Sequence, residues 1–375
     1  MSADEQRSFT DWHAAFRERA RQRGNVGPAA LAAFDALTPD PEVLQRDRSQ
    51  AELVRPIWDY LDRAVTDARV DAGRALLSER RELFGRISER YGVAPEIVVA
   101  IWGVETGYGR DRGRFDVLRA LATLAADGRR RGLFEAQLMA ALRIHEDGDA
   151  REMRGSWAGA MGHTQFMPTS YLAYAVDFDG DGRRDIWSDD PTDALASTAA
   201  YLARFGWQSG APWGHEVRLP EGFDLRLADR RTRRGGADWA RLGVARADGG
   251  LLDEAGEGAL LLPAGAEGVA FLALDNFRVV ERYNRAVSYV LAVGHLADRL
   301  AGRGPLVGTW PRQARVLETQ ERRELQERLT SAGFCTRGAD GLIGPDTVAA
   351  VRAYQLAHGL RPDGYASVCL LERLR

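Results

Sequence analysis

The stretch IWGVETGYGR, residues 101–110, decides how the chain around it is interpreted. It ends an apolar run that begins at Pro95, a residue suited to the first turn of a helix. A short helix that is apolar nearly all round is expected to be buried. Glu105 stands at its end, next to two glycines. Burial favours the neutral carboxyl and should raise its pKa, as a general acid near neutral pH requires.

Position alone supports a second interpretation of Glu105 equally well. Structural carboxylates paired with arginine are also found at buried helix ends. No second carboxylate stands at a spacing that would pair with Glu105. This disfavours the scheme in which two carboxylates of the enzyme flank a glycosidic bond.

Helical periodicity extends on both sides of this stretch, and a different pattern follows later. Residues 1–90 are predicted to be helical, and three further helices are expected at 115–128, 132–148 and 191–207. Residues 213–275 are richer in glycine and contain short strand-like runs, so a small β-containing insertion is predicted there. Helical periodicity returns over 276–302.

The end of the chain is predicted to form a separate unit. Residues 302–315 are rich in glycine and proline and indicate a linker with some freedom. Residues 316–375 have an apolar set of their own. The predicted core residues are Leu325, Leu329, Phe334, Ile343, Val348, Val351, Tyr354, Leu360 and Leu370.

Composition narrows the classes of protein that fit. The chain has 375 residues, a net charge of −3 and 28% charged residues, whereas nucleic-acid-binding proteins usually have a basic excess. No apolar run is long enough to span a bilayer. The first residues, MSADEQRSFT, lack the cationic and apolar regions of a signal peptide.

The two cysteines, Cys335 and Cys369, lie near the C-terminus. Their spacing does not indicate a metal site. Two unrelated buried thiols and a disulfide that closes the C-terminal unit fit the spacing equally well. A disulfide would require an oxidising compartment.

Two polar-aromatic segments are candidates for ligand binding. In SWAGAMGHTQFMPTSY, residues 156–171, Ser156 and Gln165 could hydrogen-bond a polar ligand, although a tightly packed loop is an alternative. In DNFRVVERYNRAVSYV, residues 275–290, Tyr283, Asn284 and Tyr289 offer the aromatic faces and amides that suit sugars. Buried aromatic residues with satisfied polar tips are the alternative here.

An acidic segment, DFDGDGRRDIWSDDPTD at 177–193, begins as an EF-hand calcium loop does. Asp177, Asp179 and Asp181 alternate, and Gly182 stands at the sixth position. The twelfth position is Ser188, so the closing ligand must come from one of the aspartates that follow, Asp189, Asp190 or Asp193. A cation is favoured over a solvated acidic turn, because carboxylates this close repel one another.

Together these segments resemble the lytic murein transglycosylase B family over roughly residues 8–300. The stretches that carry the resemblance are WDYLDRAV, IWGVETGYGR, AGAMGHTQFMPTSY, VDFDGDG and NFRVVERYN. The segment LQERLTSAGF…ADGLIGPDTVAAVRAYQLAHGL is similar to three-helix peptidoglycan-binding modules. The sequence departs from the family at Gly107 and Tyr108, where bulkier or basic residues also occur in the family. It departs again in the acidic segment, which is two residues longer than the family pattern.

The resemblance implies a mainly α fold. It comprises a lysozyme-like helical catalytic domain over 1–301 with the small β-containing insertion, the linker, and a peptidoglycan-binding domain over 316–375. It also implies that Glu105 is the catalytic residue. Glu105 would protonate the glycosidic oxygen between N-acetylmuramic acid and N-acetylglucosamine, and would then deprotonate the muramic acid C6 hydroxyl as this attacks C1. The nucleophile belongs to the substrate, so no second carboxylate is needed.

The resemblance also implies the remaining site residues. The substrate-binding positions are Ser156, Gln165, Tyr283, Asn284, Tyr289 and Tyr60. The implied ligands of a structural Ca²⁺ are Asp177, Asp179, Asp181, the carbonyl of Arg183, and Asp193. No organic cofactor is implied.

The implied substrate is the peptidoglycan glycan strand, which lies outside the cytoplasm. A periplasmic monomer is therefore expected, whose sequence begins after a removed signal peptide, and a Cys335–Cys369 disulfide is favoured. Two alternatives stay open for the function: a muramidase in which Glu105 activates water, and a non-catalytic peptidoglycan-binding scaffold. A calcium-regulated protein is a weaker third alternative.

Overall fold

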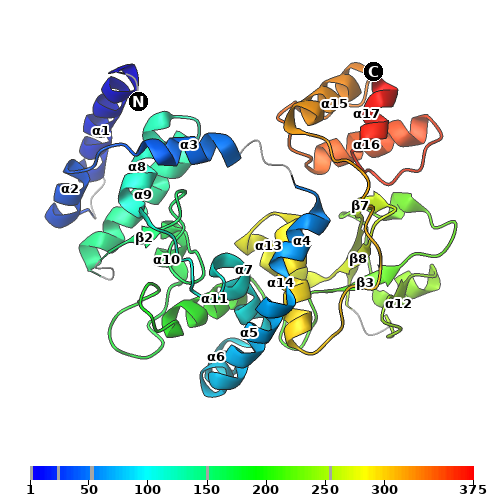
Figure 1. Ribbon diagram of the computed structural model, residues 1–375, viewed down its shortest axis with the longest axis horizontal. Coiled ribbons are helices and arrows are strands. Elements are labelled where there is room, and N and C mark those ends of the chain that lie inside the picture. The colour runs from blue at the N-terminus through cyan, green and yellow to red at the C-terminus, as the bar shows by residue number, and fades with distance from the viewer. Residues whose placement is uncertain (1–2, 23–25, 51–54, 149–151, 253–255) are drawn as a thin grey trace. The chain divides into compact units, whose positions relative to one another are not determined.

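The computed structural model describes the chain except for residues 1–2, 23–25, 51–54, 149–151 and 253–255. The chain forms two compact units: unit 1 comprises residues 1–50 and 71–204, and unit 2 comprises 51–70 and 205–375. Helices dominate the described residues and strands are short (Figure 1), which confirms the predicted mainly α fold with small sheets.

Unit 1 is built almost wholly from helices. They are α1 (Ala3–Gln22), α2 (Pro28–Asp35), α3 (Pro41–Gln50), α6 (Arg81–Tyr91), α7 (Pro95–Thr106), α8 (Val117–Asp127), α9 (Arg131–Asp147), α10 (Pro168–Tyr174) and α11 (Thr192–Arg204). Helix α5 (Asp67–Glu79) carries the chain into this unit from unit 2. Strand β1 (Phe115–Asp116) pairs antiparallel with β2 (Arg154–Gly155). The predicted helices at 115–128, 132–148 and 191–207 correspond to α8, α9 and α11.

Helix α7 has the predicted form. Pro95 occupies its first turn, and residues 97–103 are all buried. Gly107 ends the helix in the left-handed conformation, with φ of 57°, and its N–H donates to the Gly103 carbonyl. Glycine adopts this conformation without the steric cost that other residues incur.

Unit 2 begins with α4 (Ile57–Ala64), which packs against α14. Its strands are β3 (Gly214–Arg218), β4 (Arg233–Arg234), β5 (Ala245–Arg246), β6 (Gly258–Leu261), β7 (Pro263–Ala266) and β8 (Ala270–Ala273). Its helices include α12 (Gly236–Arg241), α13 (Asp275–Tyr283), α14 (Val287–Leu300), α15 (Thr319–Ser331), α16 (Pro345–Ala357) and α17 (Val368–Leu374). A short 3-10 helix, η1, spans Leu225–Leu227.

The β-containing segment forms a five-stranded antiparallel sheet in the order β4-β6-β8-β3-β5. Leu260 of β6 lies opposite Leu272 of β8, and both side chains are buried in one core with Trp239. The helical segment over 276–302 is interrupted between α13 and α14. Asn284 is extended there and its Oδ1 accepts a hydrogen bond from the Ala286 N–H at 3.1 Å, a local turn that competes with the helix.

The linker is held to the sheet. The Glu216 carboxylate of β3 accepts the N–H groups of Val307 at 2.9 Å and Gly308 at 2.6 Å. Arg312 pairs with Asp62 of α4 at 2.6 Å. The freedom predicted from glycine and proline content is therefore restricted by side chains distant in sequence.

The C-terminal module has the three helices that the resemblance implies, α15, α16 and α17 (Figure 1). Of the predicted core, Leu325, Leu329, Val351, Tyr354 and Leu370 are buried in one cluster. The other four are partly buried: Phe334, Ile343, Val348 and Leu360.

The predicted disulfide is not formed. Cys335 and Cys369 are free thiols and both are exposed. They flank the apolar cluster rather than belong to it, and the cluster closes through leucine, valine and tyrosine side chains. The expectation of a covalent link in this module was therefore wrong for this structure.

The module contacts the β-containing segment of its own unit. The buried guanidinium of Arg352 in α16 pairs with Asp229 at 3.0 Å and donates to the Ala228 carbonyl at 2.7 Å. The Asp363 carboxylate accepts the Ala266 N–H at the end of β7, at 3.1 Å. These contacts fix the module on the sheet. Across the described residues, no helix is both long and apolar enough to cross a membrane.

Candidate active site

Glu105 lies in the last turn of α7 and is half-buried. Its neighbours in that turn, Trp102 and Thr106, are buried. Tyr108 follows in a left-handed conformation, with φ of 66°, and its ring meets the Trp102 ring edge-on at 5.6 Å. A Cβ on Gly103 would come within 2.8 Å of the Tyr108 ring. The two positions that depart from the family pattern therefore form a tight turn closed by an aromatic contact.

Segment 156–165 packs against the turn that follows α7. A Cβ on Gly113 would overlap the Gly155 carbonyl, so the two backbones approach as closely as glycine permits. Ser156 follows Gly155, and its Oγ accepts the Ala160 N–H at 3.0 Å. The Gln165 side chain donates to the Gly162 carbonyl at 2.9 Å. The structure thus places Ser156 and Gln165 in one loop system with the end of α7.

His163 connects this loop to α7. Its Nδ1 accepts a hydrogen bond from Trp102 Nε1 at 3.1 Å, and its carbonyl accepts one from Thr106 Oγ1 at 2.6 Å. Its Nε2 lies 2.7 Å from the Ser188 carbonyl. Burial lowers the pKa of His163, and the Arg112 guanidinium acts in the same direction. The ring is therefore neutral at neutral pH.

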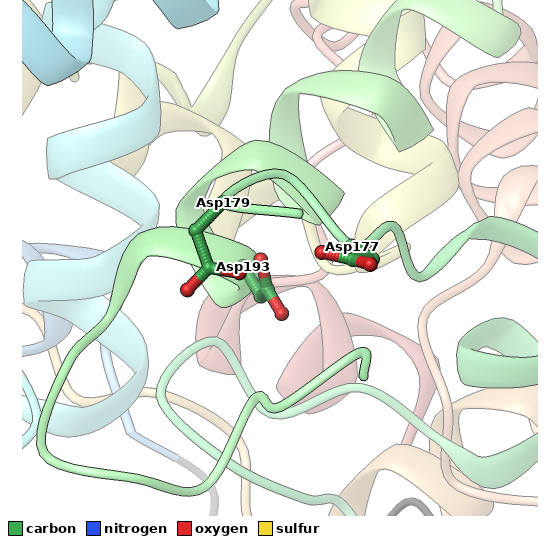
Figure 2. A group of neighbouring side chains, drawn as sticks. All are labelled: Asp177, Asp179 and Asp193. Atoms are coloured by element: carbon green, nitrogen blue, oxygen red, sulfur yellow. The ribbon is translucent and has the colours of Figure 1, made fainter. Parts of the chain in front are cut away.

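The acidic segment gathers three of its carboxylates. Oxygens of Asp177, Asp179 and Asp193 lie within 4.8 Å of one another, and Figure 2 shows these side chains grouped beside the loop. Asp177 accepts the N–H groups of Gly180 at 2.7 Å and Gly182 at 2.9 Å, which closes the predicted turn.

Asp193 closes the loop from the first turn of α11. It is 3% exposed and accepts the N–H groups of Phe178 at 2.8 Å and Asp185 at 2.9 Å. Burial raises the pKa of Asp193 to about 6, and the charges of Asp179 and Asp177 add to this effect. Oxygen donors and mutual repulsion of this kind suit a hard divalent cation. The predicted ligand Asp181 lies outside the group of three, is exposed, and accepts the N–H of Arg183, which is also exposed.

The other predicted substrate-binding residues belong to unit 2. Tyr60 in α4 and Tyr283 at the end of α13 are half-buried, and Asn284 is exposed. Tyr289 in α14 is only 2% exposed. The alternative interpretation, a buried aromatic residue, therefore describes Tyr289 better than a contact with substrate.

His163 and its partners Trp102, Thr106 and Arg112 were not predicted from the sequence. A usable signal was nevertheless present. His163 follows Gly162 directly in a segment of small residues, where close backbone approach leaves a polar ring to bridge neighbouring segments.

Comparison with known proteins identifies the class. Residues 8–298 match the family model described as Transglycosylase SLT domain, and residues 318–374 match a peptidoglycan binding domain model. The chain belongs to this transglycosylase family, which confirms the predicted class of enzyme, a lytic transglycosylase.

Particular relatives agree with this assignment. Membrane-bound lytic murein transglycosylase B of Escherichia coli (strain K12) is 34% identical over 250 residues, which are 64% of this chain and 66% of that protein. The crystal structure of SltB3 from Pseudomonas aeruginosa with NAG-anhNAM-pentapeptide is 48% identical and has a TM-score of 0.93, covering 98% of this chain and 99% of SltB3. Escherichia coli Slt35 in complex with calcium is 30% identical, with a TM-score of 0.66 over 77% of this chain and 92% of Slt35.

Proposed function

We propose that this chain cleaves the β-1,4 bond between N-acetylmuramic acid and N-acetylglucosamine in peptidoglycan and leaves a 1,6-anhydro end on the muramic acid. The observation that carries the proposal is the position of Glu105. Glu105 is half-buried in the last turn of a buried helix, and its neighbours Trp102 and Thr106 bond to His163 in the loop that contains Ser156 and Gln165. The complex of the similar SltB3 with NAG-anhNAM-pentapeptide supports an anhydro product.

In this proposal Glu105 acts first as a general acid and then as a general base. Its carboxyl proton passes to the glycosidic oxygen as the bond from that oxygen to C1 of the muramic acid breaks. The carboxylate then takes the proton of the muramic acid C6 hydroxyl while O6 bonds to C1. Glu105 ends protonated, as it began, and no water is consumed.

The groups around Glu105 support this chemistry. Trp102 and Thr106 are fully paired and buried, which holds the last turn of α7 in one place. Ser156 and Gln165 in unit 1 are proposed to contact the glycan. For Tyr60, Tyr283 and Asn284, which belong to unit 2, the proposed contact with glycan rests on the family resemblance alone. A carboxyl held in one orientation transfers its proton without first being reoriented.

We also propose that the acidic loop binds Ca²⁺ through Asp177, Asp179 and Asp193. The bound ion would neutralise carboxylates that otherwise repel one another. The role is structural, because Asp193 joins the loop to the start of α11. Slt35, a similar protein, has been crystallised in complex with calcium.

The C-terminal module is proposed to bind peptidoglycan and so to raise the concentration of glycan near the catalytic residues. A substrate in the cell wall places the protein in the periplasm, and we propose that it acts as a monomer.

Digestion of purified sacculi tests the function. Soluble products of the wild type, Glu105→Gln and Glu96→Gln are weighed by mass spectrometry. Glu96 lies in the first turn of the same helix and provides a matched control. The wild type and Glu96→Gln should release products one water lighter than hydrolysis products, and Glu105→Gln should release none.

Other outcomes select the alternatives. Products with a reducing muramic acid end would make the protein a muramidase in which water attacks C1. Full activity in Glu105→Gln would reject Glu105 as the acid. Wall binding with no products from any of the three proteins would leave a scaffold.

A further inference from the structure

We propose that His163 is a positioning residue for Glu105: its ring and carbonyl fix the last turn of α7 against segment 185–189. This inference rests on the proposed role of Glu105. His163 touches that turn at two points, through Trp102 Nε1 at 3.1 Å and Thr106 Oγ1 at 2.6 Å. Trp102 precedes Glu105 by three residues and Thr106 follows it directly, so the two contacts bracket the acid.

The hydrogen bonds define the tautomer of His163. Because the indole N–H of Trp102 can only donate, Nδ1 of His163 must accept. The ring proton is therefore on Nε2, which donates to the Ser188 carbonyl at 2.7 Å. A neutral ring with this tautomer satisfies Trp102 and Ser188, and an imidazolium would place two N–H groups against each other at Trp102. The Arg112 guanidinium can only donate, so in this tautomer its acceptor is the Ser188 carbonyl and not Nε2.

Burial is the largest effect on the pKa of His163 and lowers it, whereas the charged groups around the ring act in opposite directions: the Arg112 guanidinium lowers the pKa and the Asp189 and Asp185 carboxylates raise it. Arg112, from the turn after α7, lies 3.1 Å from Nε2 and donates to the same Ser188 carbonyl at 2.8 Å. Asp189 pairs with Arg112 at 2.9 Å, and Asp185 acts on the ring from the same segment. Helix α7 contributes the uncharged groups of Trp102 and Thr106 to this contact.

The backbone of His163 is fixed as firmly as its ring. Its N–H donates to the Ile186 carbonyl at 3.1 Å. A Cβ on Gly109 would come within 2.5 Å of Nδ1, so the turn after α7 lies directly on the ring. Thr106 Oγ1 also accepts the Gly109 N–H at 2.9 Å. His163 therefore contacts the helix end, the following turn and segment 185–189, and Arg112 adds a second link between the turn and that segment.

The consequence for catalysis is geometric. General acid transfer requires Glu105 within hydrogen-bond reach of the glycosidic oxygen. A displacement of about 1 Å can cost a rate factor of about 100. Substrate binding depends on other side chains, so loss of the His163 contacts should lower kcat and leave KM nearly unchanged.

Two substitutions separate the contacts of the ring. In His163→Asn the Oδ1 atom stands near the position of Nδ1 and still accepts from Trp102. In His163→Gln the amide nitrogen reaches the position of Nε2 and keeps the Ser188 contact, but the acceptor for Trp102 is lost. His215→Gln makes the same change at another buried histidine, in β3.

The experiment measures kcat, KM and melting temperature with a soluble glycan of two N-acetylglucosamine–N-acetylmuramic acid repeats, below the melting point of every variant. We expect kcat of His163→Gln to fall by about 10- to 100-fold with KM within about twofold of wild type. His163→Asn should recover kcat to within about threefold of wild type, and His215→Gln should lower only the melting temperature.

Three results would overturn the proposal: wild-type kcat in His163→Gln, a rise in KM with kcat unchanged, or equal losses of kcat in His163→Asn and His163→Gln. Glu105→Gln is assayed in parallel. If it retains turnover, the role of Glu105 itself fails, and this outcome is distinct from a failure of His163 alone.

Discussion

Arg352 and Asp229 form an ion pair of 3.0 Å that joins helix α16 of the C-terminal module to the turn before β4. The Arg352 side chain is 10% exposed, and it also donates to the Ala228 carbonyl. If either partner of such a pair is removed, the other is left partly or wholly buried without this hydrogen bond, which costs free energy.

Arg352→Ala is expected to lower the free energy of unfolding of the module's contact with the sheet by roughly 2–4 kcal/mol. Differential scanning calorimetry should then show the module melting ahead of the rest of unit 2. Arg226→Ala provides the control, because Arg226 pairs with Asp224 on the surface with 64% of its side chain exposed. An equal loss of stability in both variants would show that the Arg352–Asp229 pair stabilises the protein no more than an exposed surface pair does.

Asp193→Asn is expected to abolish stabilisation by Ca²⁺. Asparagine can still accept the Phe178 N–H but carries no charge for the ion. Wild-type protein at a Ca²⁺ concentration 100 times the dissociation constant should gain about 2.7 kcal/mol over protein in chelator, seen as a higher melting temperature. Asp181→Asn should keep most of this gain, because Asp181 lies outside the group of three carboxylates. Complete loss in Asp181→Asn would show that the ion has a different ligand set.

Asp298→Asn is expected to change how stability depends on pH. Burial raises the pKa of Asp298 in α14 to about 6, above its value in the unfolded chain. The folded protein therefore holds this proton more tightly, and the stability it contributes is lost as pH rises from about 4 through 6.

Asparagine cannot ionise, so the variant does not lose stability in this way. Its free energy of unfolding relative to wild type should therefore increase between pH 4 and pH 7, by at most about 3 kcal/mol. Urea unfolding at a series of pH values measures the difference. Parallel curves for the two proteins over that interval would contradict the prediction.

Gly113→Ala is expected to disrupt the loops around Glu105. Gly113 has φ of 89°, and a Cβ there would meet the Gly155 carbonyl, a backbone atom that cannot turn aside. The conformation alone costs about 1–2 kcal/mol for alanine, and the overlap adds to it. Gly148→Ala is the matched control, with φ of 74° and no atom within 4 Å of the added Cβ. The melting temperature should fall clearly more in Gly113→Ala than in Gly148→Ala. Equal decreases would show that the overlap with the Gly155 carbonyl does not destabilise the protein.

Local sequence was enough to predict the elements nearest the site. The apolar run from Pro95 to Val104 has the character of a buried helix, and Gly107 can end it wherever it packs. The turn at Asp177 is also local, since its aspartates accept hydrogen bonds from N–H groups two to five residues away.

The features that could not be predicted depend on partners far away in the chain. Residues 55–70 belong to unit 2 although the described residues on either side of them in the sequence belong to unit 1, because α4 packs against α14. The amphipathic pattern of α4 would serve any apolar partner. His163 was missed for a related reason. Its partners come from α7 and from residues 186 and 188, and a single histidine in a sequence gives no sign of them.

The two hydrogen bonds from the linker to Glu216 change what the C-terminal module can do. A free tether lets a binding module sample a sphere whose radius follows the length of the linker. Here the Glu216 carboxylate on β3 holds the linker against the sheet. The ion pair of Arg352 with Asp229 holds the module itself against the same β-containing segment. With the module on a glycan strand as proposed, the sheet and helices α13 and α14 keep a fixed offset from the bound sugars. The distance between the module and the sheet is then set by the fold of unit 2 and not by the length of a flexible linker.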